Sequence, residues 1–391
     1  MINLLQRLRI LRNKFYQGET NVIVSALGIV LVSPLLAGSA LSLWYAKHKG
    51  LDHRKRDSFE DPEFTGFTLV RLPVCNQSSV AETSESVVLP SDIAKMAEEA
   101  KTKLSGHWHP NDVIVASYPK SGTTWLSEAV YLIVNRLNWI KAYSSNLEER
   151  VPYLEYIWPG PSTILRTPAP RVIKTHLPFH LLPEEVRNGE CTRIVYIVRD
   201  PRDVVVSYYH FVRCFVPAGY QNLEGLEGFV RRFLDDKLPY SPWCRHVRSY
   251  YEAATSFLEK KDDQKNDVRP KVLLITYEMF KCDPHATLKL IEEFIHETWV
   301  DGPDNSRRPK RLTCSQISEL AEHCSFEKMS GNRTTNFEWM KDMGLWSTKE
   351  GTRFMRRGKI GDHQRTLTPS QVGKIVEKVE KAGLQWTLAK S

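Results

Sequence analysis

Tyr118-Pro119-Lys120-Ser121-Gly122-Thr123-Thr124-Trp125 is the stretch of sequence that decides the fold. It follows the apolar run Val113 to Ser117 and leads into a segment, 126–137, whose apolar residues recur at helical spacing. A strand, a turn with glycine and hydroxyl residues at a helix N-terminus expose backbone N–H groups and the positive end of the helix dipole. The stretch therefore predicts a cradle for a phosphate group.

Another interpretation of this turn remains open. A tight turn between a strand and a helix, with a threonine as N-cap, would give a similar pattern. The loop is not a Walker A motif, which reads G-x-x-x-x-G-K-[ST], because Lys120 stands two residues before the glycine. The lysine in the turn favours the phosphate cradle over the plain turn.

The residues after this loop alternate short apolar runs with helical periods. The runs lack polar alternation, as strands buried on both faces do. This order predicts an α/β fold, P-loop-like and three-layered, with a central parallel sheet flanked by helices, and the domain should cover 91–391. The further strands are expected at Arg171 to Lys174, Arg193 to Val198 and Val272 to Thr276, and the further helices at 203–214, 284–297, 315–329 and 369–382.

An uncharged segment of 27 residues, Thr20 to Ala46, precedes the domain and ends in a Trp-Tyr-Ala tripeptide. About 20 apolar residues span a hydrocarbon core, so we expect a transmembrane helix over 21–46, after a basic amphipathic N-terminus over 1–20. A cleaved signal peptide, with small residues at 37–40, and a buried core helix are the alternatives. Residues 47–90 read as a juxtamembrane linker grading into the domain.

The charge distribution excludes a broad nucleic-acid-binding surface. The net charge is +8, but residues 1–56 contain nine Lys and Arg against two acidic residues, so little net charge remains for the rest of the chain. Four of these cations precede the apolar segment and five follow it, so the count hardly favours either membrane orientation.

The seven cysteines show no C-x-x-C spacing, so the sequence signals neither a zinc site nor a disulfide framework. This cysteine usage favours a reducing compartment and a domain on the cytosolic face of the membrane, with the Golgi lumen as the alternative. Two glycosylation sequons, at Asn76 and Asn332, would matter only in a lumen.

Three segments together resemble the cytosolic-type sulfotransferase family. Lys120 to Trp125 is similar to the family's 5′-phosphosulfate loop, Val198 to Phe211 to its 3′-phosphate segment, and Phe354 to Asp362 to its C-terminal R-K-G-x-x-G-D segment. The likeness runs from about 65 to 385 and leaves the apolar segment outside it. It implies a PAPS-dependent sulfotransferase, where PAPS is 3′-phosphoadenosine 5′-phosphosulfate and PAP is the product left after transfer.

The resemblance implies a donor site built from five separate segments. Arg199 and Ser207 would bind the 3′-phosphate, and Tyr277 would contact the nucleotide. The remaining residues assigned to the donor by resemblance are Lys120, Ser121, Gly122, Thr123, Thr124, Trp125, Cys324, Ser325, Phe326, Met329, Phe354, Met355, Arg356, Arg357 and Gly358.

The chain departs from the family's pattern at several positions. Arg357 replaces a lysine and keeps its charge, Cys324 replaces a threonine, and His363 stands where a tryptophan is usual. The family's dimerisation pattern, K-x-x-x-T-V-x-x-x-E, begins here with Gln364 and ends with Gly373, so both charged ends are lost. That mode of dimerisation is not expected.

His176 is the candidate general base. It follows the second expected strand, and ligands sit at strand ends in open parallel sheets. The segment Lys174-Thr175-His176-Leu177-Pro178 is similar to the family's K-T-H-L-P, whose histidine is catalytic. We expect His176 to deprotonate the acceptor, Lys120 to stabilise the leaving oxygen and Lys174 to support the developing charge, without a metal.

The acceptor is expected to be a small lipophilic phenol, steroid or alcohol, or an amine. Tyr153 and Tyr156, in a segment similar to the family's V-P-F-L-E-F, would line its pocket. Two other functions stay open: a P-loop nucleotide kinase or nucleoside triphosphatase, and a catalytically inactive membrane scaffold that binds PAP or PAPS.

Overall fold

The computed structural model describes residues 58–73, 86–189, 192–259, 271–302, 308–349 and 352–384. The predicted transmembrane helix over 21–46 and the basic segment over 1–20 lie outside these residues. Among the helices that are described, none has both the length and the apolar character of a membrane span.

Four parallel strands form the central sheet, as the sequence predicted. They are β4 (Asp112–Ala116), β5 (Val172–Thr175), β6 (Thr192–Val198) and β7 (Lys271–Thr276), in the order β5-β4-β6-β7. Both faces of the sheet are buried: Ile114 and Ile194 belong to one hydrophobic cluster, whereas Val113 and Val195 belong to another on the opposite face. This double burial explains why the strands carry no polar alternation.

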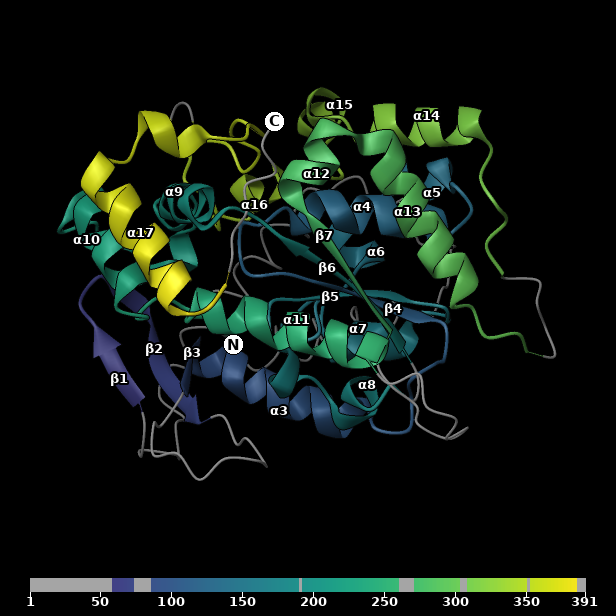
Figure 1. Ribbon diagram of the computed structural model, residues 1–391, viewed down its shortest axis with the longest axis horizontal. Helices are drawn as coiled ribbons and strands as arrows, with labels where there is room; N and C mark the ends of the chain where they lie inside the picture. The colour runs from purple at the N-terminus through teal and green to yellow at the C-terminus, as the bar shows by residue number, and fades with distance from the viewer. Residues whose placement is uncertain are drawn as a thin grey trace, which may run out of the picture.

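Helices cover both faces of the sheet (Figure 1). One face is covered by α4 (Thr123–Val134), α12 (Tyr277–Cys282), α13 (Pro284–Glu297) and α14 (Cys314–His323). The other face is covered by α3 (Ser91–Leu104), α7 (Pro161–Arg166), α8 (Glu184–Arg187) and α11 (Trp243–Glu259). The helices α9 (Pro201–Val212), α10 (Gly225–Leu234) and α17 (Pro369–Lys381) contribute to the same hydrophobic cluster and lie beside the sheet in Figure 1.

Shorter helices complete the described domain. They are α5 (Trp139–Ser144), α6 (Leu147–Arg150), α15 (Phe326–Gly331) and α16 (Trp339–Asp342), with 3-10 turns η3 (Phe179–Leu181), η4 (Val216–Ala218) and η5 (Asp362–Arg365). The α/β fold with a flanked parallel sheet is confirmed.

The single helix predicted over 315–329 was wrong, because the structure has two helices there. α14 ends at His323, and the Ser325 side chain accepts a hydrogen bond from the Lys328 N–H at 3.3 Å, which caps the start of α15. A serine that caps a new helix ends the preceding helical period. The break lies in the middle of the segment assigned to the donor.

The interpretation of 47–90 as a linker is corrected by a second sheet. β1 (Ser58–Asp61), β2 (Phe64–Pro73) and β3 (Ser86–Pro90) pair antiparallel in the order β1-β2-β3. Phe64 is buried in the core, and a Cβ atom on Gly66 would lie 1.9 Å from the carbonyl oxygen of Pro217. The sheet is therefore part of the domain, and glycine lets β2 lie directly against η4.

The strand order fixes where the domain holds a ligand. The chain passes from β4 to β5 on one side and then returns to place β6 on the other side of β4. Such a switch leaves an opening between the loops at the carboxyl ends of β4 and β6. These loops carry Lys120 and Arg199.

Candidate functional site

A cavity of about 720 Å³ lies at the carboxyl ends of the parallel strands. Its wall includes the loop after β4, the start of α12 and the C-terminal segment 354–359, and it continues along Phe64 and Phe67 of β2. A cavity of this size accommodates a drug-sized ligand, and such sites commonly combine an apolar lining with a few polar groups.

The loop after β4 presents an uncapped helix N-terminus to the cavity. Gly122 takes the N-cap position of α4 with φ of 109°, and no side chain caps the helix there. The alternative of a plain turn with a threonine N-cap is therefore wrong, since Thr123 is already helical. Free N–H groups in the first turn and the helix dipole both favour an anion.

Lys120 has a strained backbone conformation and lies close to other positive charges. Its φ of 69° is in the left-handed region, which costs energy for a residue with a side chain. Desolvation first, and then the charges of Arg199 and Arg356, lower the pKa of Lys120 to about 7. The ammonium lies 4.1 Å from the ring centre of Phe354 and 4.4 Å from that of Phe211. An anion bound in the cavity would raise the pKa of Lys120 again and favour its charged form.

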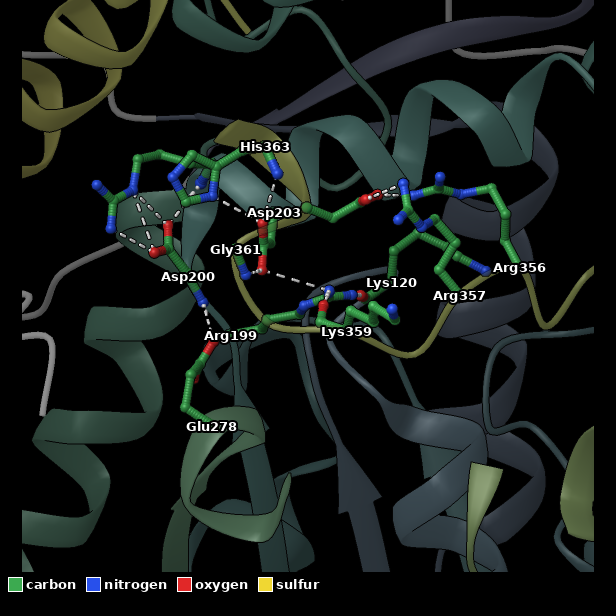
Figure 2. A network of polar contacts seen from close by, with 12 residues as sticks. Lys120, Arg199, Asp200, Asp203, Glu278, Arg356, Arg357, Lys359, Gly361 and His363 are labelled. Carbon is green, nitrogen blue, oxygen red and sulfur yellow. Dashed lines mark hydrogen bonds and ion pairs between the residues drawn. The ribbon is translucent and has the colours of Figure 1, made fainter. Parts of the chain in front are cut away.

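Arg199 reaches the same space from the end of β6 (Figure 2). Its guanidinium donates to the carbonyl oxygen of Lys359 at 2.9 Å, lies 3.5 Å from Asp203 and stacks over the Tyr277 ring at 4.2 Å. Its Nε is buried without a hydrogen-bond partner. A buried N–H without a partner is costly, so this atom has capacity for an anion.

The Asp203 carboxylate ties the C-terminal loop to α9 (Figure 2). It accepts hydrogen bonds from the Gly361 N–H at 2.8 Å, the His363 N–H at 3.0 Å and His363 Nδ1 at 2.7 Å. Burial alone would raise the pKa of Asp203, but the hydrogen bonds from His363 and the charge of Arg199 outweigh it and hold that pKa below its usual value. A carboxylate only accepts, so Nδ1 of His363 carries its proton.

His363, the departure from the family's tryptophan, is thus part of this anchoring. It is 5% exposed and bonds to Asp203 through both its backbone and its ring. Next to it, Asp362 pairs with Arg356 and with Arg357, the latter at 2.8 Å. A Cβ atom on Gly358 would lie 2.2 Å from the Phe326 ring, so glycine permits the close approach of this loop to α15.

Aromatic rings lie beside the cations. The Trp125 indole stacks on Phe280 with ring centres 3.9 Å apart and 3° between the planes, and Tyr277 meets its edge at 5.5 Å. Cys324 and Met329 are buried near it, and both line the cavity. Stacked aromatic faces beside a phosphate cradle suit a nucleotide base.

His176 lies at the end of β5 in one fixed tautomer. Its Nδ1 is 2.8 Å from the carbonyl oxygen of Ser117, which can only accept, so Nδ1–H donates and Nε2 keeps its lone pair. The Tyr153 hydroxyl lies 3.2 Å from Nε2. Burial first, and then the charge of Lys174, lower the pKa of His176 to about 3, so the ring is neutral at physiological pH. The cavity is therefore lined by an unprotonated ring nitrogen that is hydrogen-bonded to Tyr153.

Lys174 lies behind this base in a buried ion pair. Its ammonium donates to Glu148 Oε1 at 2.6 Å and lies 4.2 Å from the ring centre of Tyr153. Tyr153 in turn stacks on Tyr156 with ring centres 3.9 Å apart. Both tyrosines line the cavity, as the sequence predicted, whereas Lys174 is among the predicted site residues that do not.

The structure brings most of the predicted site residues together around one cavity. Ser121 and Ser325, like Lys174, are not among its lining residues: the Ser121 Oγ is buried without a partner and Ser325 caps α15. The lining residues are Lys120, Gly122, Thr123, Thr124, Trp125, Tyr153, Tyr156, His176, Arg199, Ser207, Tyr277, Cys324, Phe326, Met329, Phe354, Met355, Arg356, Arg357 and Gly358.

Several lining residues were missed by the sequence reasoning. Lys281, Lys359 and Phe211 contribute to the cation-rich part of the wall, and Phe337 and Trp339 to the aromatic part. Phe211 had a signal, because it lies four residues after Ser207 and so on the same helix face. Phe337 and Trp339, near α16, had no such signal, since they follow no helical or strand periodicity in the sequence.

The donor groups that line this cavity fit an anion. In the described ranges, no group of three or more His, Cys, Asp and Glu side chains is placed to hold a metal ion. The cations, the uncapped helix and the neutral histidine can bind phosphate groups and accept a proton from a ligand in the same cavity.

Comparison with known proteins identifies relatives of the chain. Residues 110–386 match the family model described as "Sulfotransferase domain". Sulfotransferase 1A1 of Mus musculus is 32% identical over 266 residues, which cover 67% of this chain and 81% of that protein. Sulfotransferase 1E1 of Homo sapiens is 30% identical over 283 residues, which cover 71% of this chain and 86% of that protein.

The fold also has solved counterparts. A crystal structure of retinol dehydratase in a complex with retinol and PAP superposes with a TM-score of 0.66 and 23% sequence identity. The match covers 86% of this chain and 98% of that chain. The likeness extends the shared fold beyond the 110–386 match, over most of the chain.

The Asp203 carboxylate should contribute to stability in a pH-dependent way. We expect Asp203→Asn to lower the free energy of unfolding by roughly 1–3 kcal/mol at pH 7, because two backbone N–H groups and Nδ1–H lose their charged acceptor. A lowered native pKa gives stability that is complete above the unfolded pKa of about 3.9 and is lost as the pH falls through the native pKa. Urea unfolding at pH 7 and pH 3 measures it.

The control is Asp342→Asn, which removes an exposed ion pair to Arg333 of 3.4 Å. That variant should change the unfolding free energy by less than about 0.5 kcal/mol. An Asp203→Asn deficit that is equally large at pH 7 and at pH 3 would contradict the role of the charge.

Proposed function

Because the chain belongs to the sulfotransferase family, we propose that it transfers a sulfuryl group from PAPS to a hydroxyl or amine of a small lipophilic acceptor. The enzyme class, a sulfotransferase, follows from the family match and the relatives. The observation that carries the proposal is the meeting, in one cavity, of a cationic phosphate cradle and the neutral His176.

The residues present fit PAPS. The uncapped start of α4 with Lys120 suits the 5′-phosphosulfate, and Arg199, with a buried unpartnered Nε, suits the 3′-phosphate together with Ser207. The Trp125 stack suits the adenine. The retinol dehydratase structure holds PAP in the same fold, which agrees with this assignment.

When bound, PAPS supplies a sulfuryl group on a phosphate leaving group. His176 Nε2 accepts the proton of the acceptor hydroxyl as the acceptor oxygen bonds to sulfur, and the bond from sulfur to the bridging phosphate oxygen breaks. Lys120 in its charged form neutralises that leaving oxygen. Ser117 keeps the histidine in the required tautomer through its carbonyl oxygen. Lys174 acts on this site from behind Tyr153, paired with Glu148.

Binding of PAP rather than ADP tests the nucleotide assignment. At a hundred times its dissociation constant, PAP should stabilise the chain by about 2.7 kcal/mol, seen as a rise in Tm, and ADP at the same concentration should give little change. Arg199→Gln should abolish most of the difference, because the fork for the 3′-phosphate is gone. An equal rise with ADP and Mg²⁺ would instead favour the nucleotide kinase.

Loss of the base tests the chemistry. With saturating PAPS, His176→Ala should lower kcat by about 10²- to 10⁴-fold across a panel of phenols, steroids, alcohols and amines. The same variant should keep the PAP-dependent rise in Tm, since the His176 ring bonds to Ser117 and Tyr153, and Lys120 and Arg199 stay in place.

His285→Ala, at an exposed position of α13, serves as the control for the loss of a histidine. Near-normal turnover by His176→Ala would remove the residue from this role. Wild-type protein that transfers sulfate to no acceptor of the panel would favour the inactive scaffold.

We also propose that residues 21–46 anchor the enzyme in a membrane with the domain on the cytosolic side. The support is the uncharged segment of 27 residues, flanked by basic residues on both sides, and a cysteine usage that favours a reducing compartment. On that side the enzyme would meet lipophilic acceptors that have partitioned into the bilayer.

Charges placed in the segment test the anchor. Leu31→Arg with Leu36→Arg should release the chain from membranes washed with alkaline carbonate, because each arginine costs about 2.5–3.5 kcal/mol at a membrane centre. The wild-type chain should stay in the pellet. A wild-type chain that washes off contradicts the anchor, and a mobility shift with glycosidase places the domain in the lumen.

A further inference from the structure

The carboxylates that line the cavity have different surroundings. They are Asp92, Glu148 and Asp362. Asp362 lies among the donor-side cations, paired with Arg356 and Arg357. Glu148 belongs to α6, whose chain continues into the tyrosine pair, and it is 4% exposed. Glu148 is therefore a buried acid on the side of the cavity where the base lies.

The Glu148 carboxylate is connected to His176 through two intervening residues, Lys174 and Tyr153. Oε1 accepts from the Lys174 ammonium at 2.6 Å, and that ammonium lies 4.2 Å from the ring centre of Tyr153. The hydroxyl of Tyr153 is the group 3.2 Å from His176 Nε2. Lys174 is also 5.6 Å from the ring centre of Phe337, another lining residue. The ion pair thus lies behind two aromatic side chains of the acceptor wall.

The second oxygen of this carboxylate has no partner. Glu148 Oε2 is buried and accepts no hydrogen bond, although a carboxylate oxygen has room for two. A single pairing with Lys174 leaves half of the group unsatisfied, and an unsatisfied buried acceptor costs free energy. A ligand group that donates an N–H or O–H would remove this cost. The apolar walls around it would strengthen such a bond.

We propose that Glu148 selects acceptors that carry a second hydrogen-bond donor, an ammonium or a hydroxyl, besides the group that is sulfated. The inference rests on the proposed function, because it assigns the acceptor to the cavity in front of His176. The class it defines is a lipophilic skeleton with a reacting hydroxyl at one end and a donor group placed toward α6. Acceptors without the second group bind to the aromatic walls alone.

Matched acceptors test this selection. The series contains phenols with a para-alkyl chain of two or four carbons, each ending in a methyl, a hydroxyl or an amine, and the corresponding aliphatic alcohols. We expect wild-type kcat/KM for the best donor-bearing member to exceed that of its methyl counterpart by about ten-fold or more, as a charge-assisted hydrogen bond would give. The measured quantity is this ratio, so a general loss of activity cancels.

Variants separate charge from hydrogen bonding. Glu148→Gln should reduce the ratio for the amine more than that for the hydroxyl, because its amide oxygen still accepts. Glu148→Met should reduce both ratios toward one. The double variant E148M/K174M removes both charges of the pair, so it gives the same readout without a buried unpaired lysine. Glu149→Gln, the exposed neighbour on α6, is the matched control and should leave the ratios unchanged.

The outcomes distinguish the inference from the proposed function. Transfer to the methyl compounds with no preference for the donor-bearing ones overturns the role of Glu148 while sulfotransfer stands. A preference for donor-bearing acceptors that survives in both Glu148→Met and E148M/K174M also overturns the role of Glu148 and leaves sulfotransfer standing. No transfer to any compound removes the proposed function itself. A preference that falls in the Glu148 variants and persists in Glu149→Gln supports the inference.

Discussion

The site depends on holding several cations close together in a partly desolvated space. Burial first, and then repulsion from Arg199 and Arg356, lower the pKa of Lys120. The protein offsets this repulsion with Asp203, whose carboxylate lies beside Arg199 and holds the backbone of the C-terminal loop at Gly361. A buried charge removed from such a network leaves its partners uncompensated. The buried Asp203 carboxylate therefore holds together the cations and the loop that form the donor half of the cavity.

The two halves of the cavity differ in whether their positive charges are clustered or occur as a single pair with an acid. The donor half gathers cations around an uncapped helix, whereas Lys174, behind the acceptor wall, is neutralised by Glu148. Stacked rings join them: Phe354 lies against Lys120, Phe337 lies near Lys174, and the two ring centres are 4.0 Å apart. Aromatic faces attract cations without adding an acid that would repel a phosphate. The rings between the two halves therefore add no further acid to those that already pair with the donor-side cations, Asp203 and Asp362.

The sequence predicted the parts of the fold that follow from local pattern. Uninterrupted apolar runs identified all four central strands, and the loop from Lys120 to Trp125 located the site. The antiparallel sheet was missed because Gly66 makes sense only through its contact with the distant η4, and Phe64 through its bridge to Tyr220. The role of His363 had no local signal either, since its partner Asp203 lies 160 positions away in the chain. Long-range pairs of this kind are fixed by tertiary structure, which overrides local preference.

The proposed base, His176, already has a hydrogen-bond partner on Nε2, and this would constrain how an acceptor binds. Its lone pair on Nε2 faces the Tyr153 hydroxyl at 3.2 Å, so an acceptor hydroxyl must take the place of that hydroxyl before it can lose a proton. Tyr153 cannot move alone, because its ring stacks on Tyr156 and covers the Lys174 ammonium. Displacing it therefore disturbs the contacts around the ion pair of Lys174 and Glu148. Binding of the acceptor and access to His176 are thus coupled through the Tyr153 side chain. The free-energy cost of displacing Tyr153 must be offset by contacts of the acceptor with the aromatic walls and with the polar groups behind them.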